Sequence, residues 1–124
     1  MNEKRKFQRY ACNIPVKFSF YEGNPDEIDL ESAAAIKGKG VIMDISKSGT
    51  FIISNSRVSI DMPINLVFSL DSKKNIKGNI VRTGLIQNNP SEVAQRYAGK
   101  KVKGDAYIAV KFDILLENIN IKNS

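Results

Sequence analysis

The sequence of 124 residues contains no histidine, no tryptophan and one cysteine, Cys12. Histidine is the commonest general base and the commonest zinc ligand, so its absence removes the usual catalytic pairs and, with one cysteine, any His/Cys metal site. A single cysteine cannot form an internal disulfide, which fits a reducing compartment. We therefore expect a cytoplasmic protein that is not an enzyme and has no metal site, with Cys12 in or near the core.

Long apolar runs are also missing, because none approaches the ~18 residues that a transmembrane helix needs. The basic N-terminus is not followed by an apolar stretch, so it does not resemble a secretory signal, and no membrane insertion is expected. Positive charge is present in excess, with 19 Lys and Arg against 13 Asp and Glu and a net charge of +6. This balance favours an anionic partner, and the length corresponds to one domain.

Apolar residues recur with a period of two, which is typical of half-buried strands. Six segments carry the pattern: 13–22, 39–46, 50–54, 62–72, 74–86 and 105–115. In the second segment one face is predicted to hold Val41, Met43 and Ile45, and the other Ile42, Asp44 and Ser46. Gly78 marks a bend or bulge in the fifth segment. Six strands separated by turn residues predict an all-β fold, either an antiparallel barrel or a sandwich.

Two segments interrupt the strands. Residues 22–39 are acidic and then alanine-rich, which is compatible with a short helix or a loop. Residues 88–104 are basic at their end, and Asn89 followed by Pro90 is suited to begin a helix. Residues 115–124 are expected to form a helical turn or two.

Two motifs carry candidate chemistry. The first is RKFQR, with Arg5 and Arg9, and the second is DISKSG, with Asp44, Ser46 and Gly49. Alone, the first is a charged tail and the second is a good turn sequence. Arginine suits bidentate phosphate contacts and stacks on rings, a carboxylate accepts from paired donors, and glycine allows a positive φ or the close approach of a ligand. Together the motifs suit a ligand that has both phosphates and guanines.

In this combination, Arg-x-x-x-Arg before the first strand and Asp/Asn-x-Ser-x-x-Gly after the second, the sequence resembles the PilZ domain family of bacterial cyclic di-GMP receptors over about residues 3–116. The resemblance implies a six-stranded antiparallel β-barrel. Our prediction adds short helical segments in 88–104 and at the C-terminus. It divides the chain into a flexible N-terminal segment, the barrel and a tail, at residues 1–12, 13–118 and 119–124.

The resemblance also implies the roles of the site residues. Arg5 and Arg9 would contact the phosphates and stack against the guanines of cyclic di-GMP. Asp44 and Ser46 would bind a guanine and adjoining groups, and Gly49 would leave room for the ligand. Arg82, in IVRTG, is a weaker match to a basic residue that family members often have on this strand. The sequence departs from the family in its long 22–39 linker, its basic 88–104 insertion and its short polar tail.

The predicted function is that of a single-domain receptor or adaptor. Binding of cyclic di-GMP would change its N-terminal surface and thereby regulate an effector protein, and no other cofactor is expected. Two alternatives stay open: a small β-barrel that binds nucleic acid, and a PilZ-like interaction domain that binds no nucleotide. Nucleic acid is not the expected partner, because most of the ten aromatic residues fall on predicted core positions.

Overall fold

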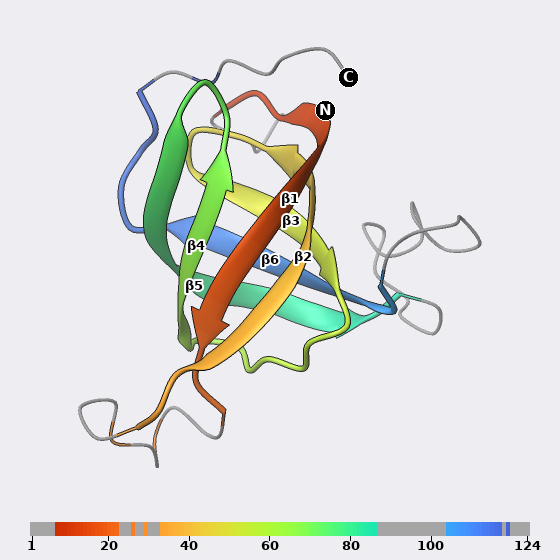
Figure 1. The fold of residues 1–124 in the computed structure, drawn as a ribbon, viewed down its shortest axis with the longest axis vertical. Coiled ribbons are helices and arrows are strands. Elements are labelled where there is room, and N and C mark those ends of the chain that lie inside the picture. The colour runs from red at the N-terminus through yellow and green to blue at the C-terminus, as the bar shows by residue number, and fades with distance from the viewer. Residues whose placement is uncertain are drawn as a thin grey trace, which may run out of the picture.

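The protein's computed structural model describes residues 7–22, 26, 29, 33–86, 104–117 and 119. It contains six strands: β1 (Tyr10–Phe20), β2 (Ile36–Ile45), β3 (Gly49–Ser54), β4 (Pro63–Ser69), β5 (Lys73–Leu85) and β6 (Ala106–Phe112). All neighbours are antiparallel, and the sheet closes into a barrel in the order β1-β2-β3-β6-β5-β4 (Figure 1). The predicted six-stranded antiparallel barrel is confirmed, and the sandwich is excluded.

The barrel closes where β1 meets β4. β1 pairs with β2 from Tyr10 to Phe20, but with β4 only through its last four residues, Lys17–Phe20. The last pair on the β4 side is Lys17 with Val67, and from there toward Tyr10 the two strands are no longer paired. This short ladder leaves a seam on the outer surface between β1 and β4.

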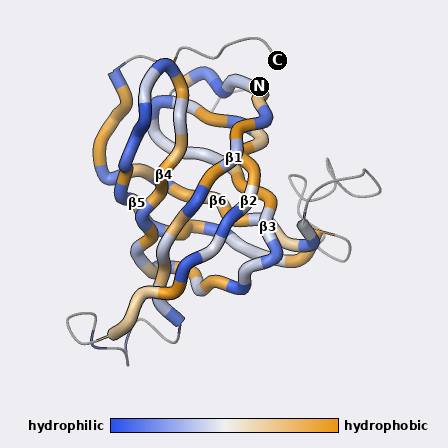
Figure 2. Tube along the Cα trace, in the orientation of Figure 1, coloured by the Kyte–Doolittle hydropathy of each residue, from blue (hydrophilic) through white to orange (hydrophobic). Residues whose placement is uncertain are grey.

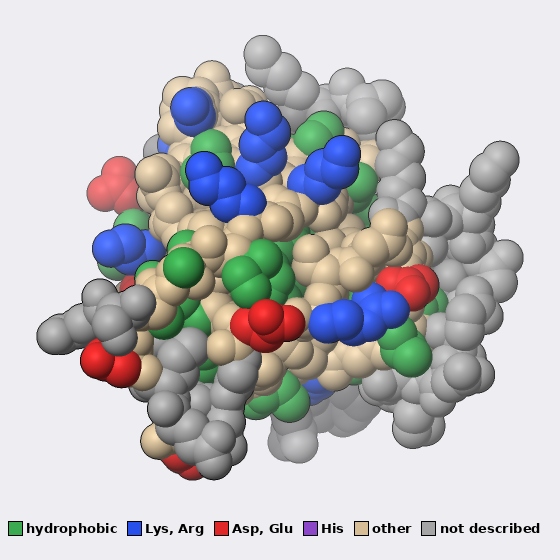
Figure 3. Space-filling view, turned by 60° about the horizontal axis from the view of Figure 1, so that its bottom comes forward, with side chains coloured by type: hydrophobic (Ala, Val, Ile, Leu, Met, Phe, Trp, Pro, Cys, Tyr) green, Lys and Arg blue, Asp and Glu red, His purple; other side chains and the backbone are tan. Residues whose placement is uncertain are grey.

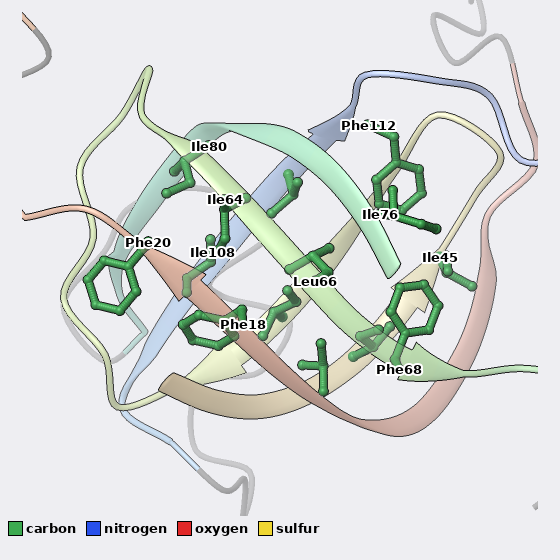
Figure 4. Close-up of a cluster of buried hydrophobic side chains, with 14 of the residues drawn as sticks. Phe18, Phe20, Ile45, Ile64, Leu66, Phe68, Ile76, Ile80, Ile108 and Phe112 are labelled. Carbon is green, nitrogen blue, oxygen red and sulfur yellow. The ribbon is translucent and has the colours of Figure 1, made fainter. Parts of the chain in front are cut away.

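Alternate residues of the strands fill the interior. Figure 2 shows hydrophobic and hydrophilic stretches alternating along the chain, and Figure 4 shows the inner side chains meeting inside the barrel. In the first, fourth and sixth predicted segments, the alternate apolar residues that are buried in this cluster are Val16, Phe18, Phe20, Ile64, Leu66, Phe68, Ile108, Val110 and Phe112. Period-two alternation therefore identified the inner face of β1, β4 and β6 correctly.

A second buried cluster lies on the outer face of β3 and β6. It consists of Phe51, Ile53, Ile86 and Tyr107, with Met43 and Ala109 packed against it. The rings of Phe51 and Tyr107 stack with centroids 5.3 Å apart. Because Ile52 points into the barrel while Phe51 and Ile53 point out, β3 is buried on both faces and all six of its residues are buried.

The predicted faces of β2 are wrong at one point. Ile42 was expected opposite Ile45, yet both lie fully buried in the interior. The pairing of β2 with β3 is shifted between Ile42 and Asp44, so Met43 is an extra residue that has no partner on β3. Such a bulge changes which face each later residue of the strand occupies, and alternation alone cannot reveal it.

A comparable irregularity occurs in β5, but not at Gly78 as the sequence suggested. The register between β5 and β6 shifts between Ile80 and Arg82, which makes Val81 the extra residue. Gly78 serves a different purpose, because a Cβ there would overlap the backbone carbonyl of Lys111. The glycine permits close approach of two backbones.

In two hairpins the strands stay paired up to the residues that flank the loop. β1 and β2 begin their ladder at Phe20 and Ile36, so β2 extends into the segment 22–39. β5 and β6 end theirs at Leu85 and Ala106, where the Ile86 N–H also donates to the Asp105 carbonyl at 3.0 Å. Between these hairpin ends, eight residues of 22–39 and nearly all of 88–104 lie outside the described residues.

No helix occurs in the part of the chain that the structure describes, so the predicted helical segments remain predictions. The same part of the chain contains no helix that is long and apolar enough to cross a membrane.

Leu66→Ala tests the importance of the interior cluster. Leu66 is fully buried at the centre of β4, so truncation should lower the free energy of unfolding by about 2–5 kcal/mol. Urea denaturation measures this loss. The control is Ile114→Ala, because Ile114 is 64% exposed and its truncation should change stability by less than about 0.5 kcal/mol. Equal effects of the two substitutions would contradict the assigned core.

Candidate functional site

The two motifs meet at one end of the barrel. Arg9 directly precedes β1, whose first pairs are Tyr10 with Ile45 and Ala11 with Asp44. This register carries Arg9 to the end of β2, where its Nη1 donates to Asp44 Oδ1 at 2.7 Å. Two residues 35 positions apart are thus joined, in keeping with the implied site. Arg5 lies outside the described residues.

Asp44 is a nearly buried carboxylate. Its side chain is 9% exposed, whereas that of Arg9 is 35% exposed. A carboxylate removed from water is costly unless it is paired, and the Arg9 guanidinium supplies a partner for Asp44. Among the described residues we find no hydrogen bond to the second oxygen, Oδ2. The Asp44 backbone is fixed as well, because its carbonyl accepts from Thr50 Oγ1 at 2.7 Å.

Ser46 closes the turn between β2 and β3. Its N–H donates to the Gly49 carbonyl at 2.8 Å, and its Oγ accepts from the Ser48 N–H at 3.2 Å. The side chain is buried, with the Oγ 3.3 Å from the Ser48 hydroxyl. The turn chemistry of the motif is therefore present in full, and Ser46 holds the loop that comes after Asp44.

Gly49 is required by the packing of β3 on β6. A Cβ at this position would overlap the backbone carbonyl of Val110. The φ of Gly49 does not lie in the left-handed region, so the positive φ allowed by the sequence is not used. The close approach at this residue is that of a neighbouring strand.

Arg82 lies on the same outer face but apart from the pair. The cross-strand register places Asp44 opposite Phe51, Phe51 opposite Ala109, and Ala109 opposite Arg82. Three strand spacings separate Asp44 from exposed Arg82, a distance of about 14 Å along the sheet. The structure thus does not bring Arg82 into contact with Asp44, and it sets the two charges at opposite ends of one row.

Sequence analysis did not predict the apolar surface between these two charges, which forms the floor of the site. Phe51 and Ala109 occupy the row, and Met43 packs against the same outer cluster. The signal was the uninterrupted apolar run FII in β3, which indicates a strand buried on both faces. The site therefore combines a paired carboxylate, an apolar floor and a distant guanidinium. The described residues hold no group of His, Cys, Asp and Glu side chains suited to a metal ion.

Cys12 lies near the core, as predicted, and it also borders the site. Its side chain is partly buried against the interior cluster, and its S–H donates to the Ile42 carbonyl with a donor–acceptor distance of 3.6 Å. Burial, and secondarily the charge of Asp44, raises the pKa of the thiol from 9.0 to about 11. Cys12 is therefore a protonated, weakly reactive thiol near neutral pH.

The pH dependence of Cys12 alkylation tests this environment. The rate with iodoacetamide should rise with a midpoint near pH 11 in the folded protein, against about 9 in the urea-unfolded control. Because folding raises this pKa, the thiol's contribution to stability is complete below pH 9 and is lost as the pH rises toward 11. A common midpoint for folded and unfolded protein would refute the assigned burial.

Gly49→Ala separates a structural from a ligand-related role of the glycine. The added methyl group must displace the β6 backbone, so the free energy of unfolding should fall by about 1–3 kcal/mol without any ligand. Urea denaturation gives the value, with Ser69→Ala at an exposed strand position as control. Unchanged stability would mean that the free protein does not need glycine here.

Comparisons with known proteins agree with this architecture. The family model for the PilZ domain matches residues 3–114. The Bacillus subtilis inhibitor of motility (MotI/DgrA) has a similar structure, with a TM-score of 0.58 and 10% identity over 94% of this chain. The match covers 46% of that protein, so the chain spans about half its length.

A second similar structure is the PilZ domain of YcgR from Escherichia coli, solved with cyclic di-GMP. Its TM-score is 0.55, with 8% identity over 90% of this chain and 79% of that chain. No curated protein sequence matches. The two structural likenesses show the fold, whereas the family match covers most of the sequence. The chain belongs to the PilZ domain family.

Proposed function

We propose that this protein is a receptor for cyclic di-GMP that acts as a single-domain adaptor and not as an enzyme. The observation that carries the proposal is the Arg9–Asp44 pair on the outer surface of the barrel. It joins the two motifs that the ligand would need. Membership of the PilZ family supports the same ligand, as does the YcgR PilZ structure, which holds cyclic di-GMP.

Binding would exchange one partner of Asp44 for another. In the free protein the carboxylate accepts from the Arg9 guanidinium. A guanine presents a ring N–H and an amino group, which together match a carboxylate. Arg9 would then turn to a phosphate of the ligand, where its planar donors form bidentate contacts. Asp44, the nearly buried member of the pair, keeps a partner throughout, which lowers the cost of the exchange.

The remaining site residues would assist from fixed positions. Ser46 and Gly49 hold the β2–β3 turn and with it the end of β2 that carries Asp44. Phe51 lies in the floor beside Asp44, and Arg82 at the far end of the row would meet a second anionic group of the ligand. We assign Arg5 to the same clamp as Arg9 on the strength of the motif.

Ligand binding would be signalled to a partner through a change of the surface near the N-terminus. Arg9 directly precedes β1, so its transfer from Asp44 to a phosphate redirects the residues before Tyr10. The ligand-bound form would present a different N-terminal surface to an effector protein. A ligand shifts such an equilibrium only by its differential affinity for the two forms, which the exchanged Arg9 contact provides.

The nucleic-acid alternative finds little stacking surface among the residues that the structure describes. Of the large apolar side chains that are exposed among the described residues, Tyr10 alone is aromatic, at 37% exposure. Sequence-tolerant binding of single strands depends on aromatic side chains that bases can stack on. A PilZ-like domain without nucleotide is the other alternative, and a titration decides between it and a receptor.

Calorimetric titration with cyclic di-GMP tests the proposal directly, with Arg9→Ala as the key variant. Loss of a charge-assisted phosphate contact costs about 1.5–3 kcal/mol, whereas release of Asp44 from a partly exposed pair returns at most about 1 kcal/mol. The net loss should lower the affinity several-fold to tenfold or more. Asp44→Asn should weaken binding too, because the amide has one acceptor oxygen and one donor NH2 group where the carboxylate has two acceptor oxygens.

The matched control is Arg57→Ala. Arg57 lies beyond the far end of β3 and pairs with exposed Asp105 at 2.7 Å, so its loss should leave the affinity unchanged. Urea denaturation of each variant verifies that it is folded. No heat with the unaltered protein would reject the receptor function, and equal losses for the two arginine variants would reject the assignment of Arg9 alone.

A further inference from the structure

A groove runs along the seam between β1 and β4, with β2 on its other side. Two adjoining hollows of about 620 and 670 Å³ form it, and they share Lys17, Lys39 and Val67. The 670 Å³ hollow lies where the β1–β4 ladder has ended, beyond Lys17 and Val67. The 620 Å³ hollow lies over the outer face of the paired part, beside Ser19 and Asn65. We call the two hollows together the seam groove. Neither Arg9 nor Asp44 lines it, so it is distinct from the candidate nucleotide site.

The described side chains that line the seam groove carry positive charges and no negative charge. Its lining includes four lysines, Lys17, Lys37, Lys39 and Lys73, and no carboxylate among the described residues. Lys17 and Lys39 lie directly opposite each other on β1 and β2. Like charges in that position destabilise a sheet, so an anionic occupant would relieve a repulsion that the free protein carries.

The surface view agrees with this distribution. Figure 3 shows several Lys and Arg side chains gathered on the upper part of the molecule, with no acidic side chain between them. The view brings the bottom of Figure 1 forward, so its upper part corresponds to the face on which β1, β2 and β4 lie.

Polar groups of the groove fit an occupant that has N–H donors and carbonyl acceptors. β1 has no β4 partner from Ile14 to Val16, so main-chain groups there face the seam, although Pro15 has no N–H to donate. Asn65 also lines the groove, and its Oδ1 is buried with no hydrogen-bond partner in the described structure. A peptide supplies both kinds of group, whereas a phosphodiester backbone supplies acceptors only.

Other anionic occupants fit less well. The aromatic residues at the groove, Phe18 and Phe68, are each 3% exposed and belong to the interior, so bases have no ring to stack on. A lipid surface would use exposed apolar side chains beside the lysines. The exposed ones in the described chain, Tyr10, Ile60, Val81, Leu85, Ile114 and Leu115, do not line the groove.

We infer that the seam groove binds an extended acidic segment of a partner protein. Glutamate or aspartate side chains would reach the lysines along both rims, and the segment's backbone would meet the unpaired groups of β1 and Asn65. The site would give the adaptor a place to hold its effector at a distance from the candidate nucleotide site. Because no residue is shared, this inference stands or falls separately from cyclic di-GMP binding.

The test is a binding titration with an acetylated, fluorescently labelled peptide of alternating glutamate and glycine. A peptide with glutamine for every glutamate is the matched ligand control. Lys39→Glu should weaken binding about tenfold, because reversal removes one exposed ion pair and adds a repulsion. Lys111→Glu changes the net charge equally at an exposed β6 position outside the groove, and should change the affinity less than about twofold.

Affinity for the acidic peptide should also fall between low salt and physiological salt, as the Debye length shrinks from about 30 Å to about 8 Å. Equal weakening by both lysine variants would overturn the inference in favour of diffuse attraction. Binding of the glutamine peptide with the same affinity would overturn it as well. So would tighter binding of a single-stranded oligonucleotide, or of phosphatidylserine vesicles, with the same dependence on Lys39. No binding of the acidic peptide would reject the site.

Discussion

The closure of the barrel through four residue pairs is the constraint on which the other features depend. Lys17–Phe20 must meet Ile64–Val67 for the sheet to have no free edge, and the same residues of β1 and β4 carry Phe18 and Leu66 into the interior. Along these four pairs the sheet satisfies its own backbone groups and offers no edge to a foreign strand, whereas β1 from Ile14 to Val16 has no partner on β4. Function must therefore be built on the outer face, at the strand ends and along the seam.

On that outer face, the nearly buried carboxylate of Asp44 needs a partner, and its ion pair with Arg9 links the residue before β1 to the barrel. Asp44 is fixed by strand pairing and by Thr50, and the Arg9 guanidinium reaches it from a residue that precedes β1. An arginine from the rigid part of the sheet would satisfy the carboxylate permanently. One that precedes the first strand could exchange its partner with little disturbance to the core, which is the property that the proposed receptor function requires.

Residue patterns predicted the inward faces of β1, β4 and β6, because alternation is a local property. The roles of the candidate site residues came from the resemblance of two motifs to a family, and the structure shows that one residue of each motif, Arg9 and Asp44, meet. Alternation failed at Met43 and Val81, where an extra residue moves the later side chains of the strand to the other face. The position of a bulge depends on the pairing with a neighbouring strand, so it cannot be predicted from the sequence of one strand alone. The role of Gly49 was hidden for the same reason, since the carbonyl that excludes a side chain belongs to Val110, far along the chain on β6.

The strand pairs that flank the loops of two hairpins have a consequence for how the sequence can vary. Phe20 with Ile36, and Leu85 with Ala106, bring the ends of two long connections together whatever lies between them. Once the ends are held, doubling the length of a flexible loop costs only about 0.6 kcal/mol of closure entropy. Within the connections from Phe20 to Ile36 and from Ile86 to Asp105, sequence can therefore be lengthened at little energetic cost while the barrel and its Asp44 site stay the same.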